Sequence, residues 1–393
     1  MKKLSLPFSL LQAVYWAMSA VAVAFMVPML RLKGFGESEI GVAMAITAVA
    51  AMIAQPLWGA LCDRLNRMKP ILLLGCGVSS LIYWLILKTD SPLAVVALSA
   101  AIGATIQSLQ TVTDSWSTKL SYAGYRLNYG FTRSMGSLAY AVTSLLFGAV
   151  VAKMGLRISP LVLLALALFM FLIVLRLPDP PAPEQEHPFS IRDAIRSLGG
   201  NAPFLVLVLC FFLVTVTSTS FITFYPVFLN ELGGNEGHLG LAYFVMAASE
   251  IPTMSNYNRL ERRFGTMPLL VFSMVGHGLR SIAVGLAGSA PLAIALMFTQ
   301  IIGWAIALPA YMSYIGQVVD RRYLSTAVLV SFALGMSLGQ IVGNAAAGYI
   351  AEGIGIAGMM FITSAFAFLA AAIMIVYGLV RKPLKTQSSK EES

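Results

Sequence analysis

Long apolar runs repeat along almost the whole of this chain and leave it few ways to fold. Each run has roughly 20 residues, the length that an α-helix needs to cross a hydrocarbon layer about 30 Å thick. The chain of 393 residues is 58% hydrophobic and 11% charged, whereas soluble domains are about 25% charged. In lipid, an open chain satisfies its backbone polar groups only as helices. The sequence therefore predicts an all-α membrane protein.

Twelve runs are expected to span the membrane, with short connections between most of them. The longest connection, residues 177–202, is rich in proline and divides the chain into an N-terminal half (1–176) and a C-terminal half (203–380) of six helices each. Residues 189–198 in this linker are typical of a short helix on the membrane surface, and residues 381–393 form a tail. The expected spans are residues 8–30, 38–60, 70–88, 93–116, 131–152, 158–176, 204–229, 238–257, 267–287, 291–313, 324–349 and 355–379.

The basic residues predict the orientation. A cytoplasmic N-terminus places 19 Lys and Arg residues on the cytoplasmic side and 5 on the other, so the positive-inside rule predicts a cell-membrane protein with both termini in the cytoplasm. The net charge of +9 then needs no nucleic-acid partner. The N-terminal segment resembles a cleaved signal peptide, but its apolar run continues to Leu30, which favours an uncleaved first helix. The five outer residues are Arg31, Lys33, Lys88, Lys153 and Arg157.

Several function classes lack their motifs. Cys62, Cys76 and Cys210 are isolated, which indicates packing residues rather than disulfides or a metal site. The sequence contains no His-Glu-x-x-His, Gly-x-Ser-x-Gly or P-loop pattern, so we expect no enzyme, no cofactor and no ATP-driven pump. If the chain transports a solute, an ion gradient or the gradient of the solute itself would supply the energy. We also expect a monomer.

The two halves are related by an internal repeat. Asp63-Arg-Leu-Asn-Arg67 is matched 195 residues later by Asn258-Arg-Leu-Glu-Arg262. Such repeats are common in secondary transporters, whose solute sites lie between the repeated units.

The stretch GALCDRLNRMKP, residues 59–70, resembles the loop signature of the major facilitator superfamily between helices 2 and 3. Asn66 and Met68 depart from the pattern, where a glycine and a basic residue are usual. Within the superfamily the chain resembles the lactose permease branch of oligosaccharide, nucleoside and phenylpropionate proton symporters. The matches are Gln55-Pro56, Tyr129-Gly-Phe-Thr-Arg-Ser-Met-Gly-Ser137 and Ser249-Glu-Ile-Pro252.

The resemblance implies a gating role for the loop. Asp63 is expected to face the start of helix 11 near Ser325, where the positive end of the helix dipole favours a carboxylate. Gly59 would permit the close approach that this contact requires. Gly59, Asp63, Arg64 and Arg67 are thus expected to form a latch that stabilises the outward-facing state.

Four charged residues are expected inside the membrane, where each costs about 2.5–3.5 kcal/mol at a helix centre. Asp114 lies late in helix 4 and Arg133 early in helix 5, so an interfacial salt bridge would explain both. The resemblance implies instead that they bind substrate hydroxyls. It also implies that Tyr140 stacks on the substrate.

Glu250 and Arg280 are expected near the midplane, in helices 8 and 9. Desolvation disfavours an ionised carboxylate there and a guanidinium favours it, which is the competition that a proton-coupling site needs. One alternative is a static ion pair between the helices; the other, implied by the resemblance, is substrate binding and proton coupling. His277, one turn before Arg280, either shares in the proton relay or is a packing residue.

The resemblance breaks down in helix 10, where Gln300 and Gly303 replace a histidine and a glutamate. The proton then falls to Glu250 or Asp114, or the protein is not a proton symporter. Gln300 is expected to contribute to a hydrogen-bonding cavity for a neutral solute. Other expected members are Gln107, Gln110, Gln340, Asn344, Tyr225, Tyr311 and Tyr314.

The leading prediction is a secondary active transporter that imports a small polar or aromatic solute, such as a sugar, a nucleoside or an aromatic acid, with protons. The alternative is a proton-coupled multidrug or sugar exporter, favoured by the 20 methionines and 22 phenylalanines that can line an adaptable pocket. A membrane-embedded enzyme or a receptor has neither a motif nor an extramembrane domain to support it.

Overall fold

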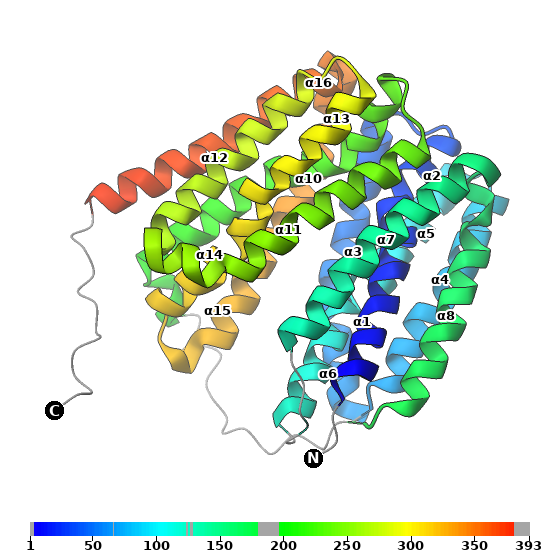
Figure 1. The fold of residues 1–393 in the computed structure, drawn as a ribbon, viewed down its shortest axis with the longest axis horizontal. Helices are drawn as coiled ribbons and strands as arrows, with labels where there is room; N and C mark the ends of the chain where they lie inside the picture. Colours follow the sequence, from blue (N-terminus) through cyan, green and yellow to red (C-terminus); the bar gives the residue numbers. More distant parts are fainter. Residues whose placement is uncertain (1–3, 66, 123–124, 126–128, 180–195, 381–393) are drawn as a thin grey trace.

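The computed structural model describes residues 4–65, 67–122, 125, 129–179 and 196–380. Over these ranges the chain forms helices joined by short connections, with no strand (Figure 1). The predicted all-α class is confirmed. Most of the surface helix expected at residues 189–198 and the whole tail at residues 381–393 lie outside the described residues.

The first half begins with a span that runs through α1 (Ser5–Ser19), the π-helical η1 (Ala20–Ala24) and α2 (Met26–Leu32). The chain then continues through further helices. These elements are α3 (Glu37–Leu65), α4 (Lys69–Lys88), α5 (Pro92–Ile102), η2 (Gly103–Gln107), α6 (Gln110–Tyr122), α7 (Tyr129–Met154), η3 (Leu156–Ile158) and α8 (Ser159–Arg176). The first span contains the π-helical segment η1, a second π-helical segment, η2, lies between α5 and α6, and the 3-10 turn η3 lies between α7 and α8.

The second half contains the same kind of helices. Its last element, α16, includes two spans, because Gly355 adopts φ 79° and turns the chain between them. A positive φ is readily accessible to glycine, which has no Cβ. The elements are α10 (Ala202–Glu231), α11 (Glu236–Phe264), α12 (Thr266–Gly285), α13 (Ala290–Leu296), η4 (Met297–Ile302), α14 (Trp304–Val318), η5 (Arg321–Tyr323), α15 (Leu324–Ser331), η6 (Phe332–Ser337) and α16 (Leu338–Val380).

Ten helical stretches among the described residues are long and apolar enough to cross a membrane. One of them, Leu324–Val380, has 57 residues and contains the turn at Gly355. The 29-residue α11 is not among the ten. Its composition is more polar than that of the other spans, and it includes Glu250. With the long stretch divided and α11 added, the structure is consistent with twelve spans.

The two halves contact each other closely at one end of the molecule, which we call the closed end. There α3 crosses α16 at Gly41 and Gly348, and α7 crosses α11 at Gly148 and Gly240. In Figure 1, α7 and α11 run side by side. A Cβ atom at any of the four positions would lie within 3 Å of the opposite backbone, so only glycine fits.

The buried apolar core is also shared between the halves at the closed end. Phe25 of the first half makes edge contacts with Phe147 and with Tyr243 of the second half, at centroid distances of 4.9 and 6.4 Å. All three belong to one continuous cluster of buried residues. A separate cluster around Phe211 and Tyr311 lies within the second half alone. The halves therefore share a core at the closed end, and the second half has its own core elsewhere.

Candidate functional site

A cavity of about 380 Å³ lies between the two halves. The elements that line it from the first half are α1, η1, α2, α3, η2, α6 and α7, and those from the second half are α10, α11, α12, η4, α14, η6 and α16. Its wall combines amide side chains with aromatic rings, a lining that can both hydrogen-bond and stack on a small solute. These residues are Gln107, Gln110, Gln300 and Gln340, with Tyr15, Trp16, Tyr140, Tyr243 and Trp304.

Glu250 and Arg280 both line this cavity, and the amide of Gln300 joins them. Gln300 Nε2 donates to Glu250 Oε1 at 2.6 Å, and Arg280 Nη1 donates to Gln300 Oε1. A direct ion pair between Glu250 and Arg280 is absent from the contacts of the described residues. The static ion pair considered from the sequence is therefore replaced by a bridge that uses both ends of one neutral amide.

The Arg280 guanidinium is buried against two methionine sulfur atoms and a phenylalanine ring. It is 3% exposed, and its Nη2 lies 3.5 Å from the sulfur of Met246 and 3.6 Å from that of Met297. The ring centroid of Phe221 lies 4.2 Å from Cζ, a cation–π contact. Arg280 Nε has no hydrogen-bond partner among the described residues. Arg280 Nε is thus a donor without an acceptor among the described residues. The carboxylate that compensates the charge of Arg280 is that of Glu250, on the other side of the Gln300 amide.

Arg133 reaches the cavity from α7 and lies over a tryptophan. Its Cζ is 4.2 Å from the Trp16 ring centroid, and Nη1 contacts Ser137 Oγ at 3.4 Å. Tyr140, two turns further along α7, lines the same cavity and meets Trp16 edge-on at a centroid distance of 6.1 Å. Sequence reasoning missed Trp16, because nothing in the pattern of the first span indicates which face meets α7.

Asp114 lies beside the cavity rather than in its wall. Gln12 Nε2 donates to Asp114 Oδ1 at 3.3 Å, which links α1 to α6. Gln12 itself is fully buried, and its Oε1 has no partner among the described residues. The expected contact of Asp114 with solute is therefore not part of the cavity in this conformation, and its role stays a prediction.

His277 also lies behind the cavity wall. It is 2% exposed, and its ring meets the cavity-lining Trp304 edge-on at 6.2 Å. Its Nε2 has no hydrogen-bond partner among the described residues. Gly303, which follows Gln300 in the chain by three residues, leaves the space that the imidazole fills. In this conformation His277 packs, and a place for it in a proton relay stays a prediction.

The remaining polar side chains expected at the site divide into two groups. Gln107, Gln110 and Gln340 line the cavity. Asn344 instead accepts a hydrogen bond of 2.7 Å from Thr223, which joins α16 to α10. Tyr225, Tyr311 and Tyr314 are buried outside the cavity wall. Helical periodicity alone does not distinguish side chains that face the cavity from those that join two helices.

Gly59 makes no close contact in this conformation, and the latch expected from the sequence stays a prediction. A Cβ atom on Gly59 would meet no atom within 4 Å, so the close approach expected there does not exist in this conformation. Arg64 and Arg67 are exposed, and the Asp63 side chain lies outside what the structure describes. In the repeated motif of the second half, Glu261 accepts hydrogen bonds from Tyr257 at 3.3 Å, from Thr266 at 2.7 Å and from Ser313.

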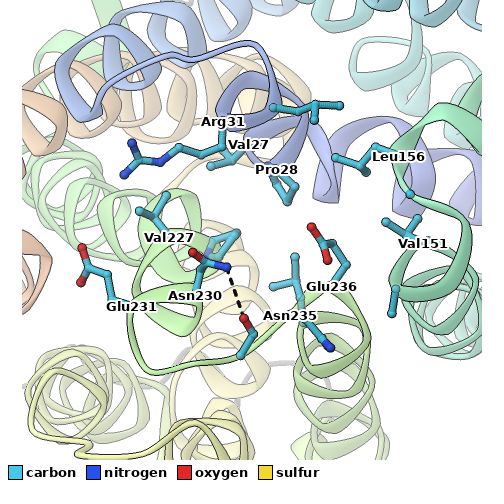
Figure 2. Close-up of a pocket in the computed structure, with 16 residues that line it drawn as sticks. Val27, Pro28, Arg31, Val151, Leu156, Val227, Asn230, Glu231, Asn235 and Glu236 are labelled. Atoms are coloured by element: carbon cyan, nitrogen blue, oxygen red, sulfur yellow. Dashed lines mark hydrogen bonds between the residues drawn. The ribbon is translucent and has the colours of Figure 1, made fainter.

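A second hollow of about 670 Å³ lies at the closed end, between α2, α7, α10 and α11 (Figure 2). Arg31, Glu231 and Glu236 lie around it, and Arg31 forms an ion pair with Glu37. Val27 lines both this hollow and the central cavity, so it lies between the two spaces. The closed end therefore has a hollow of its own, lined by both apolar and charged side chains.

Comparisons with known proteins identify the family. Residues 7–363 match the MFS_1 like family. The chain belongs to this family of major facilitator transporters. It is 26% identical over 325 residues to the maltose permease of Geobacillus stearothermophilus, covering 82% of this chain and 80% of the permease. It is 24% identical to the uncharacterized transporter YwbF of Bacillus subtilis strain 168, over 80% of this chain and 78% of that one.

Solved transporters share the fold. A point mutant of the nucleoside transporter NupG superposes with a TM-score of 0.84 at 15% identity, over 95% of this chain and 99% of that one. A bacterial homologue of the human lysosomal transporter Spinster, in an inward-facing and occupied conformation, gives 0.70 at 16% identity, over 97% of this chain and 98% of that one. The protein is thus a multi-pass membrane transporter of a small-molecule solute, and the family predicted from residues 59–70 is confirmed.

Proposed function

We propose that this facilitator-family transporter is a proton-coupled symporter of a neutral, hydroxyl-bearing solute in the cell membrane. The observation that supports this best is the bridge from Glu250 through Gln300 to Arg280 in the wall of the cavity between the halves. The other wall residues proposed to bind solute are Arg133 and Tyr140, with Asp114 joining them in another conformation. A complete cavity within one chain supports action as a monomer.

Proton coupling follows from the charge balance of the bridge. While Glu250 is ionised, its charge compensates that of the buried Arg280 across the Gln300 amide. A proton on Glu250 removes this compensation and leaves a desolvated cation, which is costly unless new acceptors approach it. Solute hydroxyl oxygens would supply such acceptors, because Arg280 Nε is without a partner among the described residues. Protonation and solute binding would then favour each other.

The charge distribution supports an orientation. If the end opposite the closed end lies in the cytoplasm, 19 Lys and Arg residues lie on the cytoplasmic side and 5 on the other, as the positive-inside rule requires. The closed end would then face the outside, and the structure would represent an inward-facing state. Transport would proceed as the halves open at the glycine crossings and close at the opposite end, around a cavity that stays between them.

Flux measurements test the proposed function. Purified protein in liposomes, with an imposed gradient that is acidic on the side of solute addition, is expected to accumulate at least one neutral member of a panel of sugars, nucleosides and aromatic acids. A protonophore is expected to abolish the accumulation but not equilibrative exchange. The proposal fails if every solute that is transported moves at the same rate with and without the pH gradient.

An exporter is the second candidate, since Met44, Met246 and Met336 line the cavity and flexible thioethers adapt to varied ligands. Cells that express the protein would then gain resistance to apolar drugs and would not accumulate the neutral solutes. The same expression strain therefore distinguishes the two directions.

Trp16 is expected to affect solute affinity through Arg133. Trp16→Leu removes the ring beneath the guanidinium, a contact worth about 0.5–2 kcal/mol, so solute affinity should fall roughly 2- to 30-fold. Trp16→Phe keeps a ring face and is expected to retain most of the affinity. Equilibrium binding to the purified protein measures both variants, and equal affinities for the two would contradict the assignment.

A further inference from the structure

A groove of about 800 Å³ faces the lipid between α4 and α8 at the closed end. Gly77, Ser80 and Trp84 line it on α4, and Leu161 and Leu164 line it on α8. Ser80 Oγ donates to the Pro160 carbonyl at 2.7 Å, which ties the two helices together beneath the groove. A Cβ atom on Gly77 would meet no atom within 4 Å, so the groove is open at its floor. The groove is separate from the cavity between the halves.

Two cations lie at the end of this groove. Lys88 ends α4 and Arg157 belongs to η3, and both line the groove and are exposed. Lys88 Nζ lies 5.8 Å from the Trp84 ring centroid. Within the described ranges, neither residue forms an ion pair or a side-chain hydrogen bond with the protein. The two positive charges therefore face the lipid–water boundary without compensation from the chain.

The acidic residue that lies nearest to Lys88 in the sequence already has a partner. Asp90, two residues after Lys88, lies 3.8 Å from Lys33, whose Nζ also donates to the carbonyls of Leu87 and Thr89. Asp90 is thus paired with Lys33, and neither Lys88 nor Arg157 has an acidic partner within the described ranges.

The second half has no counterpart of this cation pair. Residues 281–320 and 323–380, which include the corresponding helix ends, contain no Lys or Arg. If these side chains served only to anchor helix ends at the membrane surface, both halves would be expected to carry them. The asymmetry, the groove and the two uncompensated charges together indicate an anionic ligand with apolar chains.

We propose that this groove binds one anionic phospholipid from the leaflet at the closed end. Its phosphate would lie between Lys88 and Arg157, where a guanidinium can hold two phosphate oxygens at once. An acyl chain would lie along Leu81, Leu161 and Leu164, which are 55%, 61% and 45% exposed. Trp84 lies one turn before Lys88 in α4, and tryptophan is enriched at the level of lipid head groups. The proposal is independent of the solute and of proton coupling.

Lipid titration of the full-length protein in detergent tests the site, with native mass spectrometry counting bound lipids. Wild type is expected to bind one phosphatidylglycerol in preference to phosphatidylcholine. The double variant Lys88→Gln/Arg157→Gln should bind phosphatidylglycerol roughly 30-fold more weakly, because it removes two cations that each contribute about 1 kcal/mol near the head group. Lys153→Gln is the matched control, since Lys153 is an exposed closed-end cation outside the groove, and it should bind as wild type does.

Gly77→Leu provides a second variant that keeps both charges. It fills the groove floor with a side chain facing open space, so the fold should persist while lipid affinity falls at least about tenfold. Glycerol 3-phosphate without acyl chains should not compete. The proposal is overturned if the double variant keeps wild-type affinity, if phosphatidylcholine binds equally well, or if the chain-free phosphate competes as an ordinary anion.

Discussion

Replacing Gly148 or Gly348 with leucine is expected to hold the halves apart at the closed end and to stop most transport. A Cβ atom on Gly148 would lie 2.5 Å from the Glu236 carbonyl oxygen, and one on Gly348 would lie 2.8 Å from that of Glu37. Overpacking of this kind costs about 1–3 kcal/mol. That cost falls only on the state in which the crossing is closed, so the population should shift toward the opposite state by roughly 5- to 150-fold.

Solute flux and cysteine labelling measure this effect. Ala24 lines the central cavity, and an Ala24→Cys reporter is expected to react with an impermeant thiol reagent from the closed-end side only when a crossing is open. The native cysteines are buried and should contribute little background. Gly353→Leu is the matched control on α16, because a Cβ atom there meets open space. Wild-type flux and an unlabelled reporter in Gly148→Leu would show that the crossing does not control access.

Replacing Gln300 with leucine is expected to abolish solute accumulation. The change removes the donor to Glu250 and the acceptor for Arg280 at once, and leaves both charged groups without their bridge. Each unsatisfied buried group costs about 1–3 kcal/mol, and charged groups cost more. We expect a lower thermal midpoint and at least a roughly tenfold loss of solute affinity.

Two variants separate the role of the bridge from that of the cavity surface. Gln340→Leu changes another glutamine of the same cavity whose side chain makes no hydrogen bond within the described residues, so its effect should be small. Glu250→Gln removes the carboxylate that we propose binds the proton and keeps an acceptor for Gln300, so exchange of solute should persist while pH-driven accumulation is lost. If Glu250→Gln still accumulates solute with a pH gradient, the proton binds elsewhere, and Asp114 becomes the candidate.

The membrane spans and the family could be predicted because both signals are local in sequence. Hydropathy over roughly 20 residues reports the transfer of one helix into lipid, whatever its neighbours are. The motif at residues 59–70 is one short contiguous stretch, so its resemblance to facilitator transporters is visible without the fold. The span that fails a hydropathy criterion, α11, does so because it carries polar residues such as Glu250.

The site was only partly predictable, since charged residues in a span are conspicuous but their partners are not. The sequence indicates Glu250 and Arg280 as a pair and Gln300 as a cavity residue, but their arrangement as an amide bridge depends on how α11, α12 and η4 pack. Asp114 was expected in the cavity and instead contacts Gln12 from α1. The position of Trp16 under Arg133 also depends on the packing of α1 against α7.

The sequence by itself determined that this chain is a bundle of membrane helices in two related halves, because burial in lipid is a property of each segment. Only the tertiary structure decided which end of the bundle is closed. A glycine in a helix becomes a crossing point only when another backbone lies against it, as Gly41 and Gly148 do and Gly59 does not. Contacts between helices depend on how their faces are rotated toward each other, and periodicity within one helix does not specify that rotation.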